Sequence, residues 1–143
     1  MLLEHLAEMF PRHIQIHYGQ YERGQLFEAA CRSRACAYLA DDDHGPLALQ
    51  EILLAGCPVV GVRTGASFVK TGETGIVVDR LPPGLSCVET DADRTFLEAY
   101  LDAIRRAQDL DRGQIRQHAA ETFGTDKIVD GLVDALDVVQ LFA

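Results

Sequence analysis

The stretch that decides the fold is ACAYLADDDHGPLALQEILLAGCPVVGV, residues 35–62. It opens with a short apolar run, Ala35 to Ala40, and closes with another, Pro58 to Val62. Both are typical of strands that are buried on two faces of a parallel sheet. Between them, the fixed φ of Pro46 suits the first turn of a helix, which Gly56 ends. The sequence therefore predicts a strand, an acidic loop, a helix and a second strand.

The same alternation continues on both sides of this unit. Upstream, His13 to Tyr18 alternate as a strand does, and residues 22–33 carry Leu26, Phe27, Ala30 and Cys31 at helical spacing. Downstream, Ile76 to Val78 form a shorter expected strand. Strands alternating with helices imply right-handed parallel crossovers. The predicted fold class is α/β, a doubly wound Rossmann-like parallel sheet with helices on both faces.

The end of the chain is helical throughout. Apolar residues keep a helical period from Asp93 onward and again over Ile115 to Phe123, and Thr125 can cap a last helix that carries Ile128 and Leu132. The chain is expected to open with a short amphipathic helix before Pro11. We expect one domain, 1–143, that ends in C-terminal helices.

Composition limits the classes of function. A chain of 143 residues, 48% hydrophobic, can bury one core. Its net charge of −9 disfavours nucleic acid as a partner, because a phosphate-binding surface needs a basic stripe. The first ten residues carry Glu4 and Glu8 and no long apolar stretch, so neither a signal peptide nor a membrane span is expected.

Four cysteines, Cys31, Cys36, Cys57 and Cys87, form no CxxC pair and stand among apolar residues. This pattern favours buried free thiols over disulfides or a zinc site. The expected location is the reducing cytoplasm.

Two carboxylates eight residues apart, Asp43 and Glu51, are the candidate chemical groups. A loop that enters a helix after a parallel strand offers free N–H groups and a positive dipole, to which a phosphate can bind. Glu51, one and a half turns into the helix, can accept hydrogen bonds from the two vicinal hydroxyls of a ribose. The alternative is structural: an acid before a helix also serves as a cap, and a Glu within it as part of a solvated face. The run Asp41 to Asp43 favours a solvated loop over a magnesium cluster, so neither a metal nor a cofactor is expected.

The order of these motifs resembles GT-B fold retaining glycosyltransferases of the group 1, family-4-like type. Asp43-x7-Glu51, followed by Ile52-Leu53-Leu54-Ala55-Gly56-Cys57-Pro58-Val59-Val60, is similar to the family's Glu-x7-Glu motif and GxPVV strand. The segment Thr64 to Val78 resembles its glycine turn, short helix and following strand. The resemblance covers about residues 12–140 and corresponds to the later part of the C-terminal, donor-binding domain.

The resemblance implies a domain that binds a nucleotide-diphosphate sugar, UDP- or GDP-linked, for glycosyl transfer to an acceptor. Glu51 would bind the ribose, and Asp43, the candidate catalytic residue, would lie near the sugar ring. Backbone N–H groups of Gly45 and Leu47 would contact sugar or phosphate oxygens. Gly65 and Ala66 would line the cleft. The acceptor would be held by a separate N-terminal domain, so the chain alone is expected to be inactive. It is also expected either to bind that domain or to self-associate.

Several positions depart from the family's pattern. Asp43 stands where Glu is usual, so its oxygens reach about one methylene less far, and Pro46 replaces a glycine and has no N–H to donate. Phe68 stands where many relatives carry Glu, and a core aromatic explains it equally well. The family's basic phosphate-binding residues precede the matched part, and Arg63 and Lys70 are expected to be surface charges. Two alternatives stay open: a degenerate, non-catalytic GT-B-like domain used for protein interaction, and a fragment of a nucleotide-sugar epimerase.

Overall fold

The computed structural model describes residues 2–43, 47–80 and 91–126. Over these residues the helices and strands are, in order, α1 (Leu2–Met9), α2 (Arg23–Arg32), β1 (Cys36–Ala37), α3 (Leu47–Leu54), β2 (Val59–Val62), β3 (Gly75–Val78), α4 (Asp91–Ala107) and α5 (Arg112–Phe123). The three strands pair in parallel in the order β1-β2-β3. The α/β class predicted from the sequence is confirmed.

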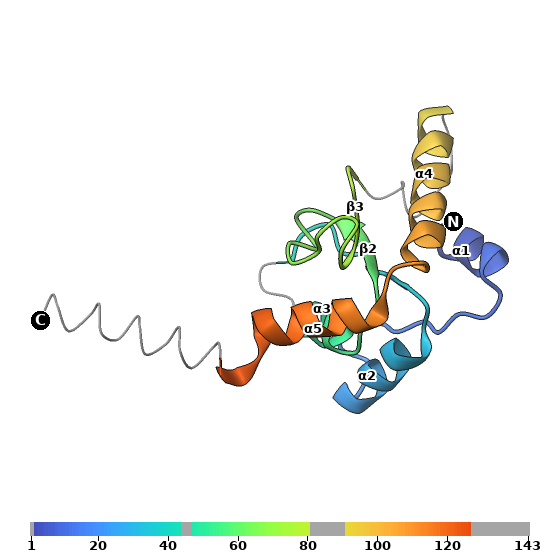
Figure 1. Cartoon of the computed structure of the whole chain (residues 1–143). Coiled ribbons are helices and arrows are strands. Elements are labelled where there is room, and N and C mark those ends of the chain that lie inside the picture. Colours follow the sequence, from blue (N-terminus) through green and yellow to red (C-terminus); the bar gives the residue numbers. More distant parts are fainter. Residues whose placement is uncertain (1, 44–46, 81–90, 127–143) are drawn as a thin grey trace, which may run out of the picture.

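The central strand β2 explains how the layers form. All four of its residues are buried, as a strand between two layers of helices requires. Adjacent side chains point to opposite faces: Val59 belongs to a core cluster with α2, α3 and α5, and Val60 to a second cluster with α4. Figure 1 shows the same arrangement, with α2, α3 and α5 below the strands and α4 with α1 on the other side.

The cluster below the sheet is built from short apolar stripes on three helices. The buried members of these stripes are Leu26 and Ala30 of α2, Leu49, Ile52 and Leu53 of α3, and Ile115 and Ala119 of α5. Helical periodicity places each set on one face of its helix. The buried apolar area of these stripes stabilises the packing of the three helices on the sheet.

The cluster above the sheet depends on α4. Tyr100, Ala103 and Ile104 contact Val60 and Ile76, and the Tyr100 side chain is 1% exposed. Its hydroxyl donates to the Val60 carbonyl at 3.4 Å, so the buried polar group has a partner. Leu6 in α1 and Phe10 just after it pack against the same cluster.

One expectation for the N-terminal half is wrong and another is confirmed only in part. His13 to Tyr18 form no strand; Ile16 packs against the core, but Ile14 and Tyr18, which would share its face in a strand, are exposed. The strand expected over Ala35 to Ala40 is confined to Cys36 and Ala37.

The cysteine expectation is wrong in part. Cys57 is buried and Cys36 is partly buried, but Cys31 is exposed, because the buried stripe of α2 consists of Leu26 and Ala30 and position 31 points away from it. Pro46, Cys87 and the last helix expected after Thr125 lie outside the described residues. Within the described ranges, no helix has both the length and the apolar character needed to cross a membrane.

Candidate functional site

The candidate site is built at the carboxyl ends of the strands, where the loops after β1 and β2 meet. Asp43 follows β1 by six residues, and its backbone N–H donates to the Thr64 carbonyl at 3.1 Å. The Thr64 hydroxyl donates in turn to the Asp41 carbonyl. These two bonds in opposite directions join the acidic loop to the loop after β2.

Gly65 makes the close approach of these loops possible. A Cβ at this position would overlap the Ala40 carbonyl, so only glycine lets the two backbones touch. Ala66 is fully buried, and its N–H donates to the Val62 carbonyl at 2.7 Å. The structure therefore brings together three predicted site residues, Asp43, Gly65 and Ala66. Ala66 contributes its backbone to the floor of this edge and leaves no side-chain surface for a ligand.

Tyr38 orients the Asp43 carboxylate. Its hydroxyl donates to Asp43 Oδ2 at 2.7 Å. Burial, together with this hydrogen bond and the charge of Asp43, raises the pKa of the Tyr38 phenol, so the hydroxyl remains a donor at neutral pH. Among the described residues no hydrogen bond to Asp43 Oδ1 is found.

Glu51 lies on α3 and faces α2. Its side chain is 17% exposed and forms an ion pair with Nε of Arg23, whose own side chain is 81% exposed. The contact uses Oε1 and leaves Oε2 without a partner among the described residues. No interaction within the described ranges joins Glu51 to Asp43 or Gly65. The alternative role considered for Glu51, a residue on a solvated helix face, agrees only in part with the structure, because the side chain is mostly covered and paired with Arg23.

The other residues considered in the sequence are either exposed, packed in the core or outside the described ranges. Leu47 begins α3 and its side chain is 68% exposed, whereas Leu49 in the same first turn is fully buried. Gly45 and His44 lie outside the described residues. Arg63 and Lys70 are exposed, as expected of surface charges. Phe68 packs edge-to-face on Phe123, with ring centroids 5.0 Å apart, which agrees with the core-aromatic reading.

A cavity of about 280 Å³ lies elsewhere, at the amino end of β3 and along α5. Its walls are Glu73, Thr74, Gln114, Gln117, His118 and Glu121. These side chains stand at the end of the sheet opposite to Asp43, so this cavity does not belong to the predicted site. In the parts of the chain that the structure describes, no group of three or more His, Cys, Asp or Glu side chains is arranged to hold a metal ion.

Sequence reasoning missed three residues of this edge: Tyr38, Thr64 and Arg23. Tyr38 gave a signal, because a hydroxyl stands within an apolar run five residues before the acid it contacts. Thr64 lies two residues after β2, and the sequence indicates it only as part of a turn. Arg23 gave none, since it is 28 residues from Glu51 in the chain.

Comparisons of the chain with protein-family models, with curated proteins and with solved structures found no match.

Proposed function

We propose that this chain is a donor-binding domain of the GT-B glycosyltransferase type, with a doubly wound sheet, which binds a UDP- or GDP-sugar for glycosyl transfer. The observation that carries the proposal is the joining of Asp43, Thr64 and Gly65 at the carboxyl edge of a parallel sheet. Ligands of open α/β sheets bind outside the carboxyl ends of the strands. The ordered resemblance from Asp43 through Val78 supports the same ligand.

The two carboxylates have different tasks in this proposal. Each keeps one oxygen without a partner among the described residues, Oδ1 of Asp43 and Oε2 of Glu51. Glu51 accepts from the vicinal hydroxyls of the ribose, as a carboxylate can do for two donors. Asp43, oriented by Tyr38, lies near the transferred sugar. An acceptor-binding domain completes the enzyme, and the free thiols of the described cysteines agree with a cytoplasmic location.

Titration of the chain with UDP and with 2′-deoxy-UDP tests the ribose contact. We expect UDP to bind more tightly than its deoxy analogue, and Glu51→Gln to weaken UDP by about ten-fold, the effect of losing one hydrogen bond to a charged group. The deoxy analogue should lose less, because it already lacks one of the two hydroxyls. Glu28→Gln on the exposed face of α2 is the matched control and should change neither affinity.

Two results would contradict the proposal. The first is the absence of any binding at about 10 mM nucleotide, a concentration well above the dissociation constant expected for a donor-binding domain without its acceptor-binding partner. The second is an equal loss for UDP and its deoxy analogue in Glu51→Gln, which would place the carboxylate away from the ribose. Transfer of a glycosyl group to an acceptor is worth testing only once nucleotide binding has been found.

A second candidate function, a non-catalytic domain for protein interaction, is favoured by one observation. Both carboxylates already have partners within the chain, Tyr38 for Asp43 and Arg23 for Glu51. If these pairs are purely structural, Tyr38→Phe and Arg23→Ala will lower stability without any nucleotide affinity to lose. Nucleotide titration therefore separates the two functions.

A further inference from the structure

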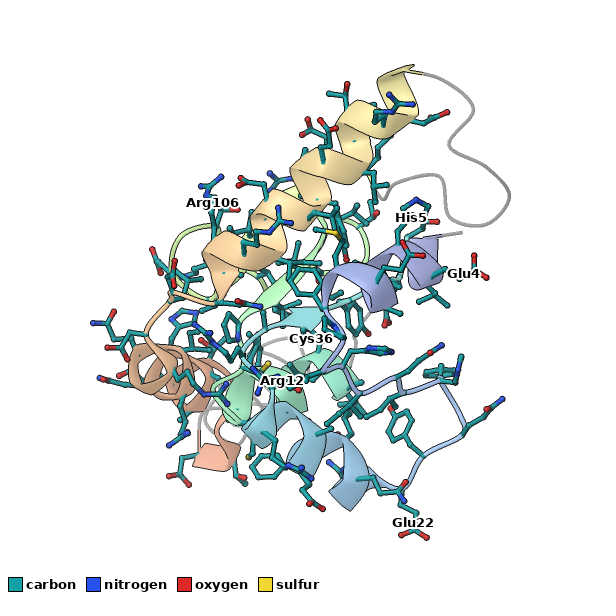
Figure 2. The ribbon with its side chains drawn as sticks, turned by 90° about the vertical axis from the view of Figure 1, so that its right-hand side faces the viewer. Glu4, His5, Arg12, Glu22, Cys36 and Arg106 are labelled. Atoms are coloured by element: carbon teal, nitrogen blue, oxygen red, sulfur yellow. The ribbon has the colours of Figure 1, made fainter. Side chains whose placement is uncertain are left out.

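Among the described residues, the fold places three arginines at the carboxyl end of the sheet. Arg63 directly follows β2, and Arg80 lies two residues after β3. Arg23 begins α2, which ends just before β1 begins, so the start of this helix lies toward the carboxyl ends of the strands. In Figure 2, Glu22 just before α2 and Arg106 in the last turn of α4 lie on opposite sides of the view. Basic residues in the last turns of helices are therefore far from the candidate site.

Two of these three arginines already have partners. Arg23 pairs with Glu51. Arg80 Nη2 lies 3.3 Å from Asp93 Oδ1, and its guanidinium lies over an aromatic ring of α4, 3.8 Å from the centroid. The Arg63 side chain is exposed, and within the described ranges no hydrogen bond or ion pair of its guanidinium is found. Exposure alone also fits a surface charge, so the place of Arg63 in the fold has to distinguish the two roles.

Arg63 stands in a turn whose backbone is held against the loop of Asp43. The Gly65 N–H donates to the Val62 carbonyl at 3.1 Å and closes the turn. The Thr64 carbonyl accepts from the Asp43 N–H, also at 3.1 Å. Arg63 is therefore the direct neighbour of the residue that joins the two loops, and its backbone is fixed beside the acid that the proposed function places near the sugar.

The diphosphate of a nucleotide sugar lies between its ribose and its transferred sugar. If Glu51 accepts from the ribose and Asp43 lies near the sugar, the diphosphate has to cross from one carboxylate toward the other. Its negative charge then approaches a loop with three successive acids, Asp41 to Asp43. A cation is needed there to offset this repulsion and the charge that develops on the leaving group. A guanidinium suits this task, because it can form two parallel hydrogen bonds to a phosphate.

We propose that Arg63 binds the diphosphate of the nucleotide donor, an inference that rests on the proposed function. Of the three arginines at this end of the sheet, Arg63 can bind an anion without breaking a contact within the described ranges. It binds the phosphate nearer to the transferred sugar, because its turn is joined to the loop of Asp43 and not to Glu51.

Titration of Arg63→Gln with UDP, 2′-deoxy-UDP and UMP tests this contact. We expect UDP and its deoxy analogue to weaken by the same factor, about ten-fold or more, because both lose the same charged hydrogen bonds. UMP lacks the second phosphate and should weaken less. Arg63→Lys should recover part of the UDP affinity, since an ammonium keeps the charge but not the planar fork.

Arg34→Gln is the matched control. Arg34 is exposed just before β1, at the opposite end of the same sheet, and its replacement changes the net charge equally. It should leave the UDP affinity within about two-fold, because salt screens charges at that separation. The Arg63 variants should keep the urea midpoint of the unmodified chain, since the side chain is exposed.

The outcomes separate this inference from the proposed function. If the unmodified chain binds no UDP, both are overturned. If UDP binds and Glu51→Gln has its expected effect, but Arg63→Gln weakens UDP no more than Arg34→Gln does, the role of Arg63 alone is overturned. An equal loss for UDP and UMP would likewise exclude a contact with the phosphate nearer to the sugar.

Discussion

Replacement of Arg112 by alanine is the strongest test of how the helices below the sheet are held together. Arg112 begins α5, and its guanidinium donates to carbonyls at the ends of two other helices. Nη1 contacts the Ser33 carbonyl, and Nη2 contacts the carbonyls of Ala30 at 3.1 Å, Cys31 at 3.2 Å and Ala55 at 3.3 Å. The ends of α2 and α3 carry negative partial charge and carbonyls without helical partners, which a cation satisfies.

The size of the effect follows from the number of these bonds. A hydrogen bond from a charged donor contributes about 1.5 to 3 kcal/mol, and bonds that share one guanidinium are not additive. Two helix ends lose their donor together, so Arg112→Ala should lower the free energy of unfolding by about 2 to 4 kcal/mol. For a chain of this length that corresponds to a fall in Tm of roughly 5 to 15 °C. Arg112→Lys should recover less than half, because an ammonium lacks the planar fork.

The assay is urea unfolding followed by circular dichroism at one fixed protein concentration, with the slope in urea checked for each variant. Arg116→Ala is the matched control: its guanidinium reaches only the Ala55 carbonyl, at 3.5 Å, and its side chain is exposed. The control should lie within about 0.5 kcal/mol of the unmodified chain. Equal midpoints for Arg112→Ala and Arg116→Ala would refute the reasoning.

Three further predictions concern a close backbone contact, an exposed helix position and a buried thiol. Gly65→Ala should destabilise the fold by about 2 to 4 kcal/mol in urea unfolding, because its Cβ would overlap the Ala40 carbonyl; an unchanged midpoint would show that the loops separate freely. Gly24→Ala should instead stabilise by about 0.5 kcal/mol, since a Cβ there meets nothing in the first turn of α2; a loss of stability would contradict this. Burial, partly offset by Arg112, raises the pKa of the Cys57 thiol from 9.0 to about 11. The folded chain therefore holds this proton to higher pH than the unfolded chain, and the stability it contributes below pH 9 is lost as pH rises to 11. Over that window the unfolding free energy should fall by about 2 to 3 kcal/mol more in the unmodified chain than in Cys57→Ala; parallel curves would contradict it.

The parts of the fold that the sequence predicts well are those with a strong local pattern. Pro58 to Val62 is a continuous apolar run, and β2 lies there with every residue buried. The apolar periods of α4 and α5 likewise correspond to observed helices. In each case the same apolar residues define both the helix or strand and the face that it buries, so one sequence pattern predicts both.

The segment His13 to Tyr18 fails for a physical reason. Alternation makes a strand possible, but a strand needs a neighbour that satisfies its backbone groups. The edge strands of the described sheet are β1 and β3, and within the described ranges the segment makes no backbone hydrogen bond to either of them. Of the three alternating residues only Ile16 packs against the core, while Ile14 and Tyr18, which would share its face in a strand, remain in solvent.

Local sequence patterns predict some residues of the candidate site, whereas the side-chain pairs of its carboxylates depend on contacts that only the folded structure shows. Asp43 and Gly65 could be found because each lies in the loop after a strand with a strong apolar pattern, and parallel strands bring such loops together at one edge. The pairs that decide what the carboxylates can do, Tyr38 with Asp43 and Arg23 with Glu51, depend on side-chain directions. Under the proposed function Arg23 would compete with the ribose for Glu51, so the affinity would depend on whether the guanidinium moves aside or stays. The Arg23 side chain is 81% exposed, so water screens the pair although Glu51 is mostly covered, and we expect it to contribute no more than about 1 kcal/mol, less than a hydrogen bond from a ligand to a charged acceptor. Under the proposed function the pair would therefore orient Glu51 without preventing a diol from reaching Oε2.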